Sequence, residues 1–89
     1  MKNRYFETIA HLILALDDNG VPSHVENLYD GYKVTFPWCC GDVIAHSGML
    51  GLGECEYTVE SMGFPWDEDD VTLLDVQEAV DLITKYYKE

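Results

Sequence analysis

The period of the hydrophobic pattern changes twice along these 89 residues, and this order constrains the fold more than any other feature. Apolar residues first recur every three or four positions, as on one side of a helix, then alternate as in half-buried strands, and finally return to the helical spacing. Each element is apolar on one side and has to bury that side. The order predicts one two-layer α+β domain over residues 1–89, with three or four antiparallel strands and the N-terminal and C-terminal helices packed on one face.

The first helical pattern ends at Asn19-Gly20, which supplies a helix stop, and Asn3 is a candidate N-cap. Glu7 and His11 interrupt the apolar run, so the pattern predicts an amphipathic helix and not a signal peptide. Its apolar stripe contains Tyr5, Phe6, Ile9, Leu12, Ile13 and Leu16.

Asp30-Gly31 lies between two strand-like runs and predicts a β-hairpin with a two-residue turn. A type I′ turn at these positions requires positive φ at both residues, which Asp and Gly tolerate. The register that follows places Tyr29 opposite Tyr32, Asn27 opposite Val34 and Val25 opposite Phe36, all on one face. The other face is mostly polar, which predicts that it faces water.

Two further strands are predicted over residues 42–47 and 54–60. The second alternates clearly, with Cys55, Tyr57 and Val59 on one side and Glu54, Glu56, Thr58 and Glu60 on the other. The C-terminal helix is predicted to begin with an imperfect capping box from Thr72 to Asp75. Its core stripe is predicted to contain Leu73, Val76, Val80, Ile83 and Tyr87.

A tripeptide occurs twice, as Phe36-Pro37-Trp38 and Phe64-Pro65-Trp66. Three residues do not establish a duplication. We expect each proline to end a strand, because proline cannot donate a backbone hydrogen bond within a sheet, and the aromatic residues to flank the core.

Acidic residues far outnumber basic residues in this chain. Lys33 is the only basic residue between Tyr5 and Thr84, a stretch that contains every acidic residue except Glu89, and the net charge of the chain is -12. Such a body repels nucleic acid and anionic membranes and attracts basic protein surfaces. The expected partner is therefore the basic surface of a nucleic-acid-binding protein, with no direct binding to nucleic acid or to a membrane.

The acids also suggest a location for that contact. Alternate residues of a strand lie roughly 6.6 Å apart, so Glu54, Glu56 and Glu60 would present carboxylates at a spacing similar to that of phosphates along a nucleic-acid strand. Trp66 is the expected aromatic anchor. The acidic run that follows it could extend the line: Asp67, Glu68, Asp69 and Asp70. Alternatively, the glutamates form a solvated sheet face and the run belongs to a helix N-terminus.

No cofactor, metal site or enzymatic activity is predicted. Three cysteines suit a reducing cytoplasm better than a disulfide framework. No C-x-x-C pair is present, so a zinc site is not expected from Cys39, Cys40, Cys55, His24 and His46. An enzymatic alternative would require Cys40 or Cys55 beside a histidine such as His46.

In size, charge and order of elements the chain resembles the small acidic inhibitors of phages and mobile elements, including anti-CRISPR proteins and other DNA mimics. The resemblance implies an α+β domain whose acidic face covers the basic nucleic-acid channel of a host nuclease, such as a CRISPR effector. No residue motif is shared, so it implies no site residue. The alternative function is an adaptor or self-associating module, monomeric or homodimeric, that uses the 48–53 loop and the two Phe-Pro-Trp corners.

Overall fold

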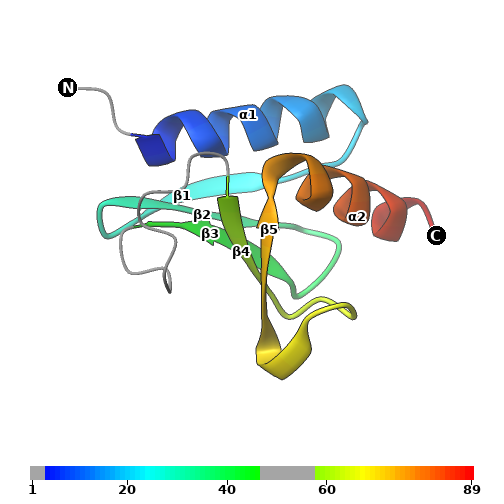
Figure 1. Ribbon diagram of the computed structural model, residues 1–89. Helices are drawn as coiled ribbons and strands as arrows, with labels where there is room; N and C mark the ends of the chain where they lie inside the picture. Colours follow the sequence, from blue (N-terminus) through cyan, green and yellow to red (C-terminus); the bar gives the residue numbers. More distant parts are fainter. Residues whose placement is uncertain (1–3, 47–57) are drawn as a thin grey trace.

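A computed structural model describes residues 4–46 and 58–89. Figure 1 shows two helices over one face of an antiparallel sheet, so the α+β class is confirmed. The sheet has five strands in the order β1-β2-β3-β4-β5, where three or four were predicted. The elements are α1 (Arg4–Asp18), β1 (His24–Leu28), β2 (Gly31–Thr35), β3 (Asp42–Ala45), β4 (Thr58–Met62), the short turn η1 (Glu68–Asp70), β5 (Val71–Asp75) and α2 (Val76–Lys88).

The additional strand, β5, occupies the segment that was predicted to begin the C-terminal helix. A short apolar run such as residues 71–74 suits a strand or a helix by its pattern alone. Antiparallel pairing with β4, which places Leu74 opposite Val59, selects the strand. Leu73 is therefore not a helix core residue, and 42% of its surface is exposed.

The predicted capping box from Thr72 to Asp75 is also wrong. The N-cap of α2 is Asp75, whose side chain accepts a hydrogen bond from the backbone N–H of Glu78 at 2.8 Å. Because an N-cap carboxylate satisfies one of the free N–H groups of the first helical turn, it fixes where the helix begins.

The β1–β2 hairpin forms, but its predicted register is wrong by two residues. Leu28 lies opposite Gly31, so the loop is Tyr29-Asp30, and Tyr29 adopts a φ of 53°. Gly31 serves a different purpose: a Cβ on this residue would lie 1.8 Å from the carbonyl oxygen of Ala45. Since a shift of two residues preserves the alternation, the predicted division of residues between the two faces remains correct.

The core lies between the sheet and the helices. Val34, Val43 and Val59 are fully buried on the helix-facing side of the sheet. The predicted stripes of both helices supply most of the opposing layer, although Phe6 and Tyr87 are 56% and 37% exposed. The buried helix residues include Ile9, Leu12 and Leu16 from α1, and Val76, Val80 and Ile83 from α2.

The predicted strand over 54–60 is found in part, because β4 begins at Thr58 and continues to Met62, and residues 54–57 lie outside the described part of the chain. Val59 is buried and Glu60 lies on the opposite side, as the alternation predicted. Within residues 4–46 and 58–89, no helix has the length and apolar character needed to cross a membrane.

Candidate protein-binding surface

The predicted acidic line falls partly outside the described residues, which do not include Glu54 and Glu56. Glu60 is half-buried on β4. The acidic run from Asp67 precedes β5 and not a helix. Its residues Glu68, Asp69 and Asp70 form η1, the turn at the far end of the β4–β5 connection in Figure 1.

The carboxylate of Asp67 accepts hydrogen bonds within the fold. It accepts one from the hydroxyl of Ser61 at 2.5 Å and another from the backbone N–H of Phe64 at 2.8 Å. The Ser61 hydroxyl in turn accepts the indole N–H of Trp66 at 3.2 Å. Asp67 therefore holds the corner that follows β4, whereas Asp69 and Asp70 are exposed.

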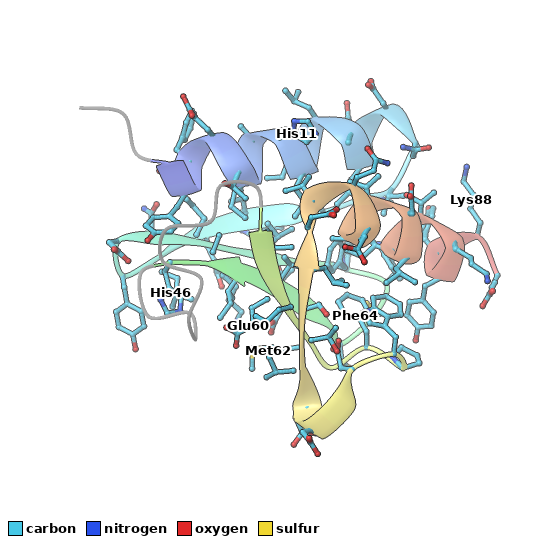
Figure 2. The ribbon with its side chains drawn as sticks, viewed as in Figure 1. His11, His46, Glu60, Met62, Phe64 and Lys88 are labelled. Carbon is cyan, nitrogen blue, oxygen red and sulfur yellow. The ribbon has the colours of Figure 1, made fainter. Side chains whose placement is uncertain are left out.

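The sheet surface opposite the helices, which we call the open face, follows from the strand register. One row across it contains Glu26, Lys33, Ile44, Glu60 and Leu73, and the next contains His24, Thr35, Asp42, Met62 and Val71. Figure 2 shows Glu60 and Met62 on the side of the sheet away from α1 and α2. These ten residues define the open face.

Four apolar residues lie on the part of the open face formed by β3, β4 and β5, and we call them the apolar patch, whereas the sequence predicted a mostly polar surface. The apolar patch contains Ile44, Met62, Val71 and Leu73. Ile44 is only 9% exposed although it lies outside the main core cluster. The prediction and the structure differ because Met62 lies beyond the predicted strand, and because Val71 and Leu73 were not predicted to be strand residues. Pairing of β4 with β5 brings these side chains together.

The charges of the open face are mostly acidic. Lys33 lies 4.0 Å from one carboxylate oxygen of Asp42, while the other oxygen of Asp42 is buried and finds no hydrogen-bond partner among the described residues. Burial raises the pKa of the Asp42 carboxyl above its usual range; Lys33 opposes this change and the charge of Asp67 adds to it. Glu26 and Glu60 lie in one row, on either side of Lys33 and Ile44.

The two Phe-Pro-Trp tripeptides converge on the other side of the sheet, in what we call the aromatic corner. The rings of Phe36 and Phe64, which are 5% and 4% exposed, meet edge to face at 5.8 Å. Trp66 stacks on Phe64 with ring centroids 4.5 Å apart. Trp38 donates its indole N–H to the carbonyl of Pro22 at 2.9 Å. Both tripeptides follow strand ends and flank the core, as expected, and their phenylalanines are buried within it.

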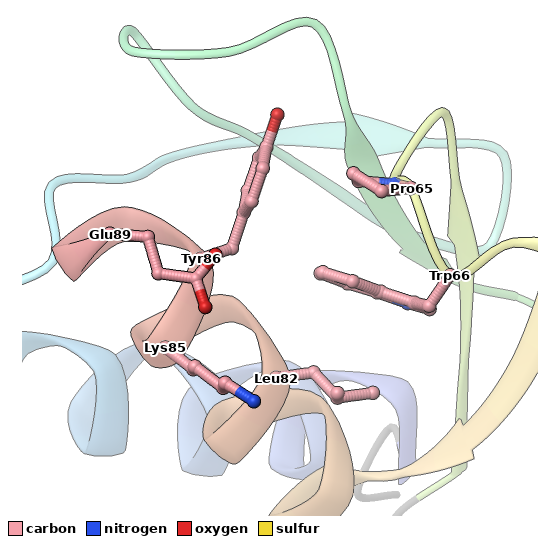
Figure 3. Close-up of a pocket in the computed structure, with 6 residues that line it drawn as sticks. All are labelled: Pro65, Trp66, Leu82, Lys85, Tyr86 and Glu89. Atoms are coloured by element: carbon pink, nitrogen blue, oxygen red, sulfur yellow. The ribbon is translucent and has the colours of Figure 1, made fainter.

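Trp66 is half-buried and forms one wall of a surface cavity of about 330 Å³, shown in Figure 3. The adjoining wall is the ring of Tyr86, which meets the indole edge to face, with ring planes at 89° and centroids 5.9 Å apart. The cavity is lined by Pro65, Trp66, Leu82, Lys85, Tyr86 and Glu89. Sequence reasoning missed it because only tertiary packing brings the corner after β4 beside the end of α2.

Cys55 and the 48–53 loop lie outside the described part of the chain, and the described candidates for metal binding and nucleophilic chemistry gain no geometric support. Within the described ranges, no three His, Cys, Asp or Glu side chains are placed to hold a metal ion together. Cys39 and Cys40 are free thiols. Burial raises the pKa of the Cys39 thiol above its ordinary value, partly opposed by a backbone hydrogen bond from Gly41. A raised thiol pKa disfavours the reactive thiolate.

No protein family matches the chain, and no curated protein or solved structure is significantly similar to it. Function is therefore inferred from the open face, the aromatic corner and the cavity between that corner and α2.

Proposed function

We propose that this chain is a binding protein that places its open face on the basic, nucleic-acid-binding surface of another protein and so keeps nucleic acid from that surface. The observation that carries the proposal is an apolar patch accompanied by acids on the same sheet face. The apolar residues are Ile44, Met62, Val71 and Leu73, and the acids are Glu26, Asp42 and Glu60. Protein interfaces typically combine apolar contact area with polar and charged residues.

The charge of the chain favours a basic partner. The net charge is -12, and the one lysine of the open face lies beside the carboxylate of Asp42. Complementary potentials accelerate association and reject partners of like charge. Extended basic surfaces are characteristic of proteins that bind nucleic acid. An effector nuclease is the partner that the resemblance to acidic phage inhibitors implies.

The apolar patch and the acids are expected to contribute differently to binding. Burial of a large apolar side chain contributes about 1.5–3 kcal/mol, whereas an exposed ion pair contributes about 0–1 kcal/mol. We therefore expect Leu73 and its neighbours to determine most of the affinity, and Glu60 and Glu26 to determine which partner is selected and how fast it is bound. An interface of this kind keeps part of its affinity at high salt.

Competition with nucleic acid tests the proposal. Purified nucleases and DNA-binding domains would be loaded with fluorescent DNA, and release of the DNA would be measured as this chain is added. We expect displacement from at least one basic protein, with an affinity that falls between about 50 and 200 mM salt. If the chain displaced DNA from none of them, the proposed function would be wrong.

Two matched substitutions test the location of the contact. Leu73→Asp places a charge in the apolar patch and should weaken displacement about 10- to 100-fold, the range that corresponds to loss of one buried leucine. Leu14→Asp is the control, because Leu14 is 67% exposed on α1, away from the open face. Equal effects of the two substitutions would exclude the open face as the contact.

A further inference from the structure

The cavity beside Trp66 lies at the end of α2, on the helix side of the sheet, and is therefore separate from the open face (Figure 3). Its walls are the perpendicular rings of Trp66 and Tyr86. Leu82 and Pro65 supply apolar surface, and Lys85 and Glu89 contribute one charge of each sign. Two contacts hold Trp66 in place: its indole stacks on the ring of Phe64, and its N–H donates a hydrogen bond to the hydroxyl of Ser61.

Arginine matches this lining better than any other side chain. Its planar guanidinium stacks on the faces of Trp and Tyr, and its methylene stem packs on apolar surface. A carboxylate such as that of Glu89 can accept two parallel N–H bonds from a guanidinium. The net charge of -12 attracts a cation to the cavity, whereas it repels an acidic ligand.

Lys85 and Glu89 both line the cavity. A cation bound there is attracted by the carboxylate of Glu89 and repelled by the ammonium of Lys85. Removal of the Lys85 charge should therefore strengthen binding of a cation, whereas it would weaken binding of an anion.

We infer that the cavity formed by Trp66, Tyr86 and Glu89 binds an arginine side chain that projects from the basic partner. The inference rests on the proposed function only for the source of that arginine. The cavity itself can be examined with Nα-acetyl-arginine amide and without any partner.

The experiment is an NMR titration of the isotope-labelled chain at about 150 mM salt. We expect chemical-shift changes at the indole N–H of Trp66 and at Leu82 and Tyr86, with a Kd of about 1 mM or weaker for so small a ligand. The backbone N–H of Tyr29, in the β1–β2 loop, should not shift. The neutral analogue Nα-acetyl-citrulline amide should bind about 2- to 30-fold more weakly, the range of a cation–π contribution.

Two exposed positions on α2 and its C-cap residue provide the variants. Lys85→Gln should strengthen binding about 1.5- to 5-fold and Glu89→Gln should weaken it by a similar factor, the range of one surface charge interaction. Glu78→Gln removes the same charge from the first turn of α2 and should leave the affinity unchanged. Equal binding of citrulline, weakening by Lys85→Gln, or equal effects of Glu78→Gln and Glu89→Gln would each overturn the arginine site.

The two proposals can fail separately. If the arginine derivative binds in the cavity but the chain displaces no DNA, the site stands and the proposed function is wrong. If the chain displaces DNA but the cavity gives no response to the derivative, the open face stands and the arginine site is wrong.

Discussion

The first residue of β2, Gly31, has no room for a side chain beside Ala45 of β3, because a Cβ at Gly31 would lie 1.8 Å from the Ala45 carbonyl oxygen. The obstacle is backbone, so Gly31→Ala can be accommodated only if β2 and β3 separate. We expect a loss of about 3 kcal/mol or more in the free energy of unfolding, above most of the range for overpacked cores. Urea denaturation followed by circular dichroism measures it.

Gly20→Ala is the matched control. Gly20 also requires glycine, since its φ is +74°, but no atom lies within 4 Å of the position that a Cβ would occupy. Gly20→Ala should lower the free energy of unfolding by about 1 kcal/mol, because a residue with a side chain is strained in the left-handed conformation. Equal losses in the two variants would contradict the close approach of β2 and β3 as the reason for Gly31.

Ser61 connects two elements of the aromatic corner. Its buried hydroxyl donates to Asp67 and accepts from the indole of Trp66. Ser61→Ala leaves both partners without this contact and should cost about 2 kcal/mol, because unsatisfied buried polar groups are expensive. Thermal unfolding monitored by tryptophan fluorescence would report both stability and the environment of Trp66.

A double-mutant cycle with Asp67→Ala isolates the interaction between the two residues. The combined variant should lose less stability than the sum of the two single losses, by about 0.5 kcal/mol or more, because both substitutions remove the same hydrogen bond. Additive losses would mean that Ser61 and Asp67 stabilise the corner independently.

Asp75 determines where α2 begins, and its side chain bonds to the N–H of Glu78 at 2.8 Å. Asp75→Ala should destabilise the chain by about 1 kcal/mol, as for other N-cap residues. Asp75→Ser keeps an oxygen acceptor and should restore most of that loss. Chemical denaturation of the three proteins under one set of conditions checks the order of stability; no loss in the alanine variant would contradict the capping role.

The features that sequence predicted well are local. The stripe of α1 and the alternation around Val59 and Glu60 depend on periodicity within one element, and both are found. Asp75 and Glu78 also form a local capping signal, an acidic N-cap with Glu three residues later, and α2 begins there and not at Thr72.

The features that were missed depend on contacts between distant segments. The hairpin register is accompanied by a close approach of Gly31 to Ala45, which belongs to another strand. β5 is too short for its pattern to identify it, and pairing with β4 selects its conformation. The apolar patch of the open face and the cavity beside Trp66 both depend on contacts between distant segments, so no short stretch of the sequence reveals them.

The carboxyl of Asp42 makes stability depend on pH. Its pKa in the folded chain is raised, chiefly by burial, so the folded state binds this proton more tightly than the unfolded state does. The stabilisation from this proton is fully present below the ordinary aspartate pKa of about 3.9 and is lost as pH rises through the higher folded value. Asp42→Asn removes the titration, and we expect the variant to be more stable than the original chain at pH 7.

The difference between the two proteins in the free energy of unfolding should shrink as the pH is lowered toward about 3, where the carboxyl is protonated in both states. Urea denaturation across this pH range measures it, and Asp69→Asn, at an exposed position of η1, controls for the general effect of removing one negative charge. If Asp42→Asn were less stable than the original chain at pH 7, the attraction of Lys33 at 4.0 Å would outweigh the burial of the carboxylate. Lys33 is itself 35% exposed, so water competes for its ammonium and the burial of Asp42 should dominate.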